Sequence, residues 1–190
     1  MPTDLLTDMS APGAGVRRIR MSWEDYLELP GWPKTEWVDG EVVVSPPVGP
    51  GHGIATLRLG AALTTALPEL FVMTEVGVRL PRNRVRAPDL MAVALLPSST
   101  VVEESPVLVV EVLSPSTRSE DTLRKGPEYA AAGIGQYWVV DPEARSLEVF
   151  ENADGRWEPL LRLDDEHPTG EVAVGDHGVV PLDLNAILPS

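Results

Sequence analysis

The chain contains 190 residues, of which 43% are hydrophobic and 23% charged, as expected for a soluble globular protein with one core. It has no cysteine, which excludes disulfides, thiolate metal sites and a cysteine nucleophile. The net charge of −14 argues against non-specific nucleic-acid binding, because such binding depends on the neutralisation of phosphates. No apolar run approaches the ~20 residues needed to span a bilayer. The acidic N-terminal residues also lack the pattern of a signal peptide, so we expect a cytoplasmic protein.

The charge is unevenly distributed along the chain. Residues 151–190 contain nine acidic and two basic residues, which is half of the net negative charge. The stretch RLPRNRVR instead concentrates four arginines in eight positions. This cluster has two interpretations, a solvated hairpin tip or an edge that contacts the phosphates of a nucleic acid. In the second interpretation the nucleic-acid-binding residues are Arg79, Arg82, Arg84 and Arg86.

The beginning of the chain predicts an arm followed by one domain. Residues 1–20 are rich in Pro, Gly, Ser and Ala, which is typical of a flexible arm. Residues 21–190 form the expected single domain, with an acidic tail region over about 151–190. Ser22 is a good N-cap for a short helix over residues 23–29, which has acidic residues in its first turn.

The next segment predicts a hairpin and a longer helix. Asp39-Gly40 separates two runs of alternating apolar residues, which is the strongest short signal for a β-hairpin. From His52 to about Leu67 the apolar residues recur at helical spacing, and Pro68 ends the pattern.

The remaining segments predict a sheet and one more helix. Strands are expected at residues 70–80, 85–96, 106–113, 136–141 and 146–151, and a helix at residues 123–132. The strand at residues 106–113 is apolar on both faces, which is typical of a central strand. The order of these elements predicts an α/β or α+β domain in which helices flank a central mixed β-sheet.

One acidic residue interrupts the most apolar of these strands. In the stretch LVVEVL, Glu111 shares its face of the strand with Val109 and Leu113. An isolated ionised carboxylate is very costly to bury, so such a residue is usually paired, neutralised or bound to a metal. We therefore interpret Glu111 as a site residue, with a satisfied structural glutamate as the alternative.

A second carboxylate lies on the preceding predicted strand. Asp89 follows a proline and opens the apolar run LMAVALL, although Pro-Asp alone also fits a turn. If the two strands are neighbours, Asp89 and Glu111 can meet. Two carboxylates and water form an all-oxygen site suited to Mg²⁺ or Mn²⁺, and such ions activate water for attack on a phosphodiester.

These residues are part of a wider resemblance. The stretches SWEDYLELP, TEWVDGEVVVSPP, GHGIATL, RAPDLMAV and LVVEVLSPST, followed by D…K…Y…G…YWVVDP, occur in this order over roughly residues 21–150. In this pattern the chain resembles the PD-(D/E)xK nuclease superfamily and, more narrowly, the Uma-type family of restriction endonucleases. The resemblance implies the restriction-endonuclease-like fold and a divalent-metal phosphodiesterase site. It also implies nucleic acid as the substrate, with DNA as the expected form.

The resemblance further implies roles for single residues. Asp89 and Glu111 match the metal-binding acids, with Mg²⁺ or Mn²⁺ as the implied cofactor. Where a simple E-x-K motif has its lysine, this chain has Leu113. Lys125 matches the place on the next helix to which the catalytic lysine has moved in similar proteins. The possible accessory residues that match family positions near the site are Glu36 and His52.

The helix that carries Lys125 contains a proline. Pro127 has no N–H to donate and disfavours helical backbone at Gly126, so the helix is expected to kink or restart there. A kink would displace Lys125 from Glu111. In that case Lys125 would pair with Asp121, which lies four residues before it.

Three functions compete at this point. The first is a Mg²⁺- or Mn²⁺-dependent endonuclease, which the resemblance favours and which commonly acts as a homodimer. The second is a nuclease-fold binding or assembly module without catalysis, which the net charge and Pro127 favour. The third is a metal-dependent hydrolase of small phosphate esters. Close approach of Asp89 and Glu111, with Lys125 beside them, would favour the first.

Overall fold

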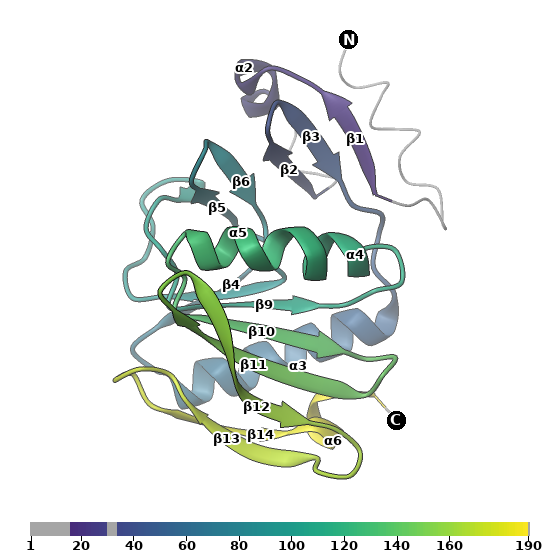
Figure 1. Ribbon diagram of the computed structural model, residues 1–190, viewed down its shortest axis with the longest axis vertical. Coiled ribbons are helices and arrows are strands. Elements are labelled where there is room, and N and C mark those ends of the chain that lie inside the picture. The colour runs from purple at the N-terminus through teal and green to yellow at the C-terminus, as the bar shows by residue number, and fades with distance from the viewer. Residues whose placement is uncertain (1–15, 30–33, 190) are drawn as a thin grey trace.

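The computed structural model describes residues 16–29 and 34–189, which fold around two six-stranded sheets (Figure 1). The central sheet has the spatial order β12 (Arg156–Leu163), β11 (Ser146–Ala153), β10 (Gln136–Asp141), β9 (Leu108–Val112), β7 (Leu90–Val93) and β4 (Phe71–Thr74). Strands β9 and β10 are parallel, whereas the other neighbouring pairs are antiparallel, so the sheet is mixed.

The second sheet, the N-terminal sheet, lies above the central sheet in Figure 1. Its spatial order is β1 (Arg17–Arg20), β3 (Glu41–Val44), β2 (Thr35–Val38), β6 (Arg84–Arg86), β5 (Gly77–Leu80) and β8 (Val101–Val102). At the opposite end of the molecule, β13 (Thr169–Ala173) and β14 (Val179–Asp183) form an antiparallel ribbon.

Helices cover both faces of the central sheet. The helical segments are α2 (Trp23–Leu27), α3 (Pro50–Ala66), α4 (Arg118–Glu120), the π-helical turn η1 (Asp121–Lys125), α5 (Gly126–Ala131) and α6 (Leu184–Ile187). Helix α3 packs Leu59 and Leu63 into the core on one face of the sheet. The continuous stretch α4–η1–α5 covers the other face, where Tyr129 packs with Met91 and Val109. Within residues 16–29 and 34–189, no helix is both long and apolar enough to cross a membrane.

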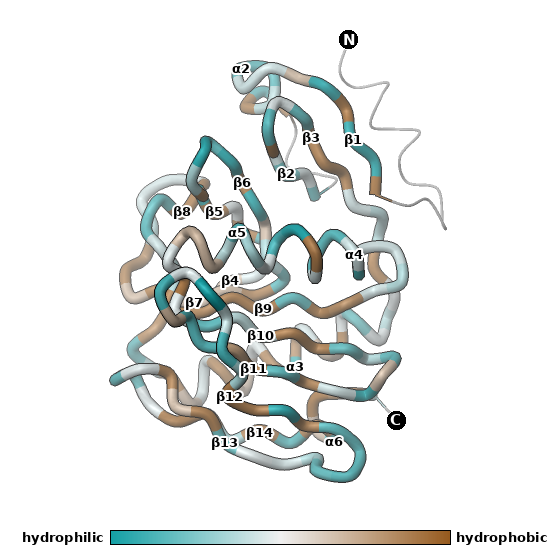
Figure 2. The backbone as a smooth tube through the Cα atoms, in the orientation of Figure 1, coloured by the Kyte–Doolittle hydropathy of each residue, from teal (hydrophilic) through white to brown (hydrophobic). Residues whose placement is uncertain are grey.

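The predicted fold class is confirmed, because helices flank a central mixed sheet. Strands β9 and β10 are buried along their whole length, as expected for central strands. Figure 2 shows hydrophobic colouring over most of β9 and over part of β10. The predicted hairpin is formed by β2 and β3, and both Asp39 and Gly40 have the positive φ that such a turn requires.

The end of the predicted arm is a strand. Residues Arg17–Arg20 form β1, which pairs antiparallel with β3. Ile19 packs against the core of the N-terminal sheet, which explains why this end of the arm is ordered into a strand. The rest of the predicted arm, residues 1–15, lies outside the described residues.

The two long strands predicted at residues 70–80 and 85–96 are each divided between the two sheets. The first is interrupted at Glu75, whose φ of 55° is incompatible with a continuous strand. The second is interrupted at Pro88, which has no N–H for a sheet ladder. As a result, β4 and β7 belong to the central sheet, and β5 and β6 belong to the N-terminal sheet. Within residues 70–96 the chain therefore crosses twice between the sheets, and Asp89 lies just after the second crossing.

Candidate active site

The register of the central sheet brings the two predicted carboxylates together. Leu90 lies opposite Val110 in the antiparallel pair β7–β9. Continuing this register by one residue places Asp89 opposite Glu111, and directly opposite residues project from the same face of a sheet. The backbone N–H of Val112 also donates a 2.8 Å hydrogen bond to Asp89 Oδ2, which ties the two strands at this point.

Glu111 is buried, with 1% of its surface exposed. Its Oε1 atom lies 3.0 Å from Lys125 Nζ and accepts a 2.7 Å hydrogen bond from Tyr129 Oη. Both partners come from the helical stretch that covers this face of the sheet. The structure thus places Lys125 beside Glu111, although Leu113 occupies the position of the lysine in an E-x-K motif, two residues after Glu111.

The expected disturbance at Pro127 takes the form of a π-helical turn. In η1 the N–H of Gly126 donates to the carbonyl of Asp121, five residues earlier. Because this wider turn leaves a backbone carbonyl without a regular α-helical partner, it accommodates a proline that has no N–H to donate. Helix α5 continues directly from Gly126, so the chain does not bend away from the sheet and Lys125 stays at Glu111.

Lys125 is surrounded by three buried carboxylates. Besides Glu111, its Nζ atom lies 3.0 Å from Asp121 Oδ1 and 3.2 Å from Glu36 Oε1. The pairing with Asp121 therefore occurs together with the contact to Glu111 and does not replace it. Glu36 comes from β2 of the N-terminal sheet, so Lys125 joins both sheets and the helix that carries it.

Asp89 has its own set of partners. His52 Nε2 lies 3.0 Å from Asp89 Oδ2, and Lys34 Nζ lies 2.9 Å from Asp89 Oδ1. His52 is located near the start of α3, where the backbone carbonyl of the same residue accepts a hydrogen bond from Thr56. Sequence reasoning missed Lys34, because a lysine at the start of a strand is normally solvated and no spacing connects it to Asp89.

The pKa values of Glu36 and Asp89 are lowered. Burial alone would raise the pKa of Glu36, but the charges of Lys125 and Arg86 lower it to about 2. Burial would likewise raise the pKa of Asp89, and Lys34 and His52 lower it below its usual value. Both groups are therefore carboxylates at neutral pH.

The pKa of Glu111 shifts in the opposite direction. Burial raises it to about 8, since Lys125 offsets only part of the lost hydration and Asp121 adds negative charge nearby. Burial also raises the pKa of Asp121. Burial on its own would lower the pKa of Lys125, but the neighbouring carboxylates raise it well above its usual value. Opposite pKa shifts within one buried cluster are typical of a functional site.

Arg86 does not lie on an exposed edge. Its side chain is fully buried, and its guanidinium donates to the carboxylates of Glu36, Glu120 and Glu128. The expectation that Arg86 contacts phosphates is therefore wrong, because carboxylates of the protein itself neutralise its charge. Glu120 also pairs with Arg18 of β1, so this network connects three elements of the N-terminal sheet to the helix of Lys125.

The other three arginines lie at or near the β5–β6 turn. The guanidinium of Arg79 lies 4.3 Å from the ring centroid of Trp23, and Arg84 donates to Asp39. Arg82 is exposed and has no hydrogen bond or ion pair with the described residues. This turn is at the end of β6 that is remote from Asp89. Of the three, Arg82 is exposed, whereas Arg79 and Arg84 are half-buried and paired with acidic residues. Phosphate contacts by Arg79, Arg82 and Arg84 stay a prediction.

The donor atoms of the cluster suit a hard divalent cation. Asp89 and Glu111 present carboxylate oxygens from adjacent strands. The hydrogen bonds to Glu111 from described residues all fall on Oε1, whereas both oxygens of Asp89 have partners, so a cation would share Asp89 with Lys34 and His52. In the described part of the chain, no group of three or more His, Asp or Glu side chains is arranged to hold a metal ion. Two carboxylates are nevertheless a usual protein contribution for Mg²⁺, which keeps several waters and binds substrate phosphates.

The site lies in a region that is similar to known proteins. The sequence model of the Uma2 family, described as "Putative restriction endonuclease", matches residues 23–178. No curated protein matches the chain. Among solved structures, "a putative nuclease belonging to DUF820" from Anabaena variabilis ATCC 29413 is 15% identical, with a TM-score of 0.73. The alignment covers 88% of this chain and 97% of that chain, so the two share their fold.

Proposed function

Because the chain belongs to the Uma2 family, described as "Putative restriction endonuclease", we propose that it is a divalent-metal-dependent endonuclease that hydrolyses phosphodiester bonds of nucleic acid, with DNA as the expected form. One observation carries this proposal. The β7–β9 register, continued by one residue, places Asp89 opposite Glu111, and Lys125 lies 3.0 Å from Glu111. Two acids and a lysine in this arrangement are the groups that metal-assisted phosphodiester hydrolysis needs.

Asp89 and Glu111 are the proposed ligands of a Mg²⁺ or Mn²⁺ ion. When bound, such an ion polarises a phosphoryl oxygen and lowers the pKa of a bound water. His52 and the backbone N–H of Val112 hold Asp89 in place through its Oδ2 atom. Lys125 provides a fixed positive charge for the negative charge that develops on the phosphate. Glu36 positions Lys125 from the side of the N-terminal sheet.

A cleavage assay tests the proposal. Plasmid DNA, single-stranded DNA and RNA are incubated with the full chain in Mn²⁺ or Mg²⁺, and the same reactions are run with Glu111→Ala and with EDTA. We expect cleavage by the wild type that Glu111→Ala reduces at least 100-fold and EDTA abolishes. Equal cleavage by wild type and Glu111→Ala would contradict the assigned site.

The same assay separates the alternatives. Tight nucleic-acid binding without cleavage in either metal would favour a nuclease fold that serves as a binding or assembly module. Hydrolysis of nucleotides or small phosphate esters without cleavage of polymers would favour a different metal-dependent hydrolase. The homodimer expected from the sequence stays a prediction, which sedimentation of the purified chain tests.

A further inference from the structure

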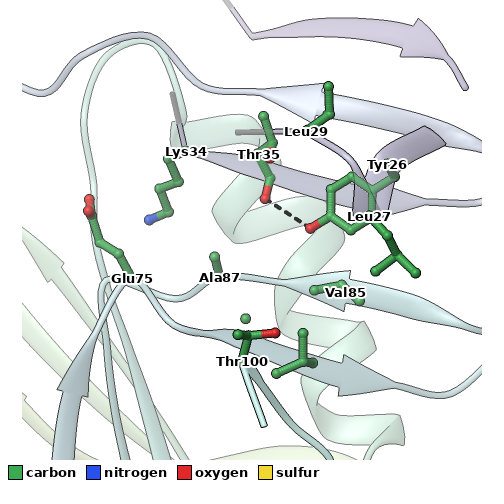
Figure 3. Close-up of a pocket in the computed structure, with 11 residues that line it drawn as sticks. Tyr26, Leu27, Leu29, Lys34, Thr35, Glu75, Val85, Ala87 and Thr100 are labelled. Carbon is green, nitrogen blue, oxygen red and sulfur yellow. Dashed lines mark hydrogen bonds between the residues drawn. The ribbon is translucent and has the colours of Figure 1, made fainter. Parts of the chain in front are cut away.

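A pocket lies on the side of the N-terminal sheet, and Figure 3 shows the residues that line it. Its volume is about 360 Å³. Its walls come from α2, from the beginning of β2, and from the segments around β5, β6 and β8. The lining residues that matter for its chemistry are Tyr26, Leu27, Lys34, Val85 and Thr100, together with the acidic residue Glu75.

Lys34 connects this pocket to the proposed metal ligands. Its side chain lines the pocket, while its Nζ atom lies 2.9 Å from Asp89 Oδ1. Ala87 also lines the pocket, and its backbone N–H donates to Glu36, which contacts Lys125. The pocket and the carboxylate cluster therefore share this wall.

The walls have the chemistry of a site for a planar, partly polar ring. Leu27 and Val85 contribute apolar surface, and Tyr26 contributes an aromatic ring that a hydrogen bond from its hydroxyl to the carbonyl of Thr35 holds in place. Thr100 adds a polar side chain opposite. Proteins recognise unpaired bases by combining stacking on aromatic or apolar side chains with hydrogen bonds to the base edge.

The size of the pocket limits what can enter it. Small-molecule pockets occupy about 300–1,000 Å³, and this one lies at the lower end of that range. A single nucleoside is a ligand of the size that such a pocket takes. A base reaches a pocket of this kind only from a single strand or after it is turned out of a duplex.

We propose that this pocket receives one unpaired nucleoside of the substrate strand, next to the phosphate that is cut, and that Lys34 contacts this phosphate. The proposal rests on the nuclease function proposed above and specifies its substrate as unpaired DNA or RNA. The side chain of Lys34 is 17% exposed and lines the pocket, with its ammonium on Asp89. An ammonium group on a flexible stem is suited to phosphate as a point charge.

A binding experiment that does not depend on cleavage tests the proposal. Single-stranded DNA and RNA oligonucleotides that contain 2-aminopurine, and the matched duplexes, are titrated with the full chain in EDTA while fluorescence is recorded. Thr100→Trp fills the pocket from an exposed position, and Thr64→Trp adds the same side chain on the exposed face of α3 as a control. Lys34→Gln removes the proposed phosphate contact, and the salt dependence of its affinity is measured.

We expect the wild type to bind the single strand at least tenfold more tightly than the duplex. Thr100→Trp should weaken this binding at least tenfold, and Thr64→Trp should leave it unchanged. Lys34→Gln should reduce the slope of log affinity against log salt concentration by about 1, the value for one phosphate contact. A purely structural role of Lys34 would leave this slope unchanged. Comparison of the DNA and RNA arms identifies the preferred strand.

Other results would overturn the proposal. Equal affinity for duplex and single strand, no binding of either, or full affinity in Thr100→Trp would each exclude the pocket as the nucleoside site, even for a protein that cleaves nucleic acid. Conversely, the expected binding pattern without cleavage of any substrate would support the pocket and contradict the nuclease function. The two failures are therefore distinguishable.

Discussion

At the scale of single residues, the charge of Lys125 determines whether the site is stable. The carboxylates of Glu36, Glu111 and Asp121 surround its ammonium, and each of these acids is at most 2% exposed. A buried carboxylate without a partner is very unfavourable. A substitution at Lys125 thus affects four buried groups at once. Unfolding measurements report its effect on folding separately from its effect on catalysis.

The substitution Lys125→Met should destabilise the domain by about 3–5 kcal/mol at pH 7, because it leaves the buried carboxylates without their shared cation. The measurement is urea unfolding at equilibrium. The matched control is Arg124→Met, one position earlier, whose side chain is 58% exposed and 3.6 Å from Glu120. Such a surface pair contributes about 0–1 kcal/mol. Equal losses for the two variants would contradict the role assigned to Lys125.

The raised pKa of Glu111 predicts a specific dependence of stability on pH. Its folded value of about 8 exceeds its usual value of 4.5, so the folded state binds this proton more tightly than the unfolded state does. The stability from this group is fully present below about pH 4.5 and is lost as the pH rises towards 8. Between pH 5 and 8 the wild type should therefore lose stability relative to Glu111→Gln, by up to about 1.4 kcal/mol per pH unit.

Unfolding free energies of both proteins in EDTA, measured at several pH values, check this expectation. Glu36→Gln is the control with the opposite sign, since the pKa of Glu36 is lowered to about 2. The stability that Glu36 contributes is present above pH 4.5 and is lost only as the pH falls towards 2. A Glu36→Gln variant should thus differ from the wild type by a constant amount between pH 5 and 8. If the difference in unfolding free energy between wild type and Glu111→Gln did not change between pH 5 and 8, Glu111 would already be ionised over this range.

At the scale of secondary structure, the π-helical turn η1 sets the direction in which Lys125 points. Glu120, before this turn, contacts Arg86, whereas Lys125, at its end, contacts Glu111. Each residue in an α-helix rotates the chain by about 100°. The residue that the π turn adds therefore allows both contacts to form, and π turns are frequent at functional sites.

Deletion of Thr122 should restore α-helical spacing and rotate one part of the helix against the other by about 100°. Either Glu120 or Lys125 then loses its partner, so we expect a loss of several kcal/mol in stability and a decrease of about 100-fold or more in cleavage. Unfolding in urea and the cleavage assay measure both effects.

The control for this deletion is Thr122→Ala. It keeps the length of the chain and removes only the 2.7 Å hydrogen bond from Thr122 to the carbonyl of Arg118. The expected loss is about 1 kcal/mol or less, with cleavage retained. If the deletion variant were as stable and active as Thr122→Ala, the spacing of η1 would not matter for the site.

At the scale of the whole molecule, local patterns were sufficient to predict the central strands and the carboxylate pair. The apolar run around Glu111 marks both a central strand and an unusual charge within it, and Asp89 opens the neighbouring strand. These features follow from residues close in sequence. The resemblance to a nuclease family then indicated Lys125, which periodicity alone would place on a solvated helix surface.

The rest of the site depends on contacts between segments far apart in the chain. Arg86 resembles its exposed neighbours in sequence, and only the approach of Glu36, Glu120 and Glu128 makes it a buried residue. Lys34 likewise becomes part of the site only through its contact with Asp89, 55 residues further along the chain. No local pattern contains this information, since tertiary packing decides which charges meet.

Binding of a metal ion should be visible in the stability of the whole domain. A ligand that binds only the folded state at 100 times its Kd raises the unfolding free energy by about 2.7 kcal/mol. We expect Mn²⁺ to produce a rise of this order in wild type and none in Asp89→Asn, measured by thermal unfolding at pH 8. At that pH Glu111 can lose its proton to a bound cation, because its pKa is about 8.

The net charge of −14 makes a control for surface binding necessary, because the acidic tail region also attracts divalent ions. Asp176→Asn removes an exposed carboxylate from this region. This variant should show the full rise in unfolding free energy that Mn²⁺ produces in the wild type. Added salt screens exposed charges more than buried ones, so the rise from the buried pair should persist at 0.5 M NaCl. A rise that is the same in Asp89→Asn as in wild type would place the ions on the acidic surface and would remove the metal from the proposed site.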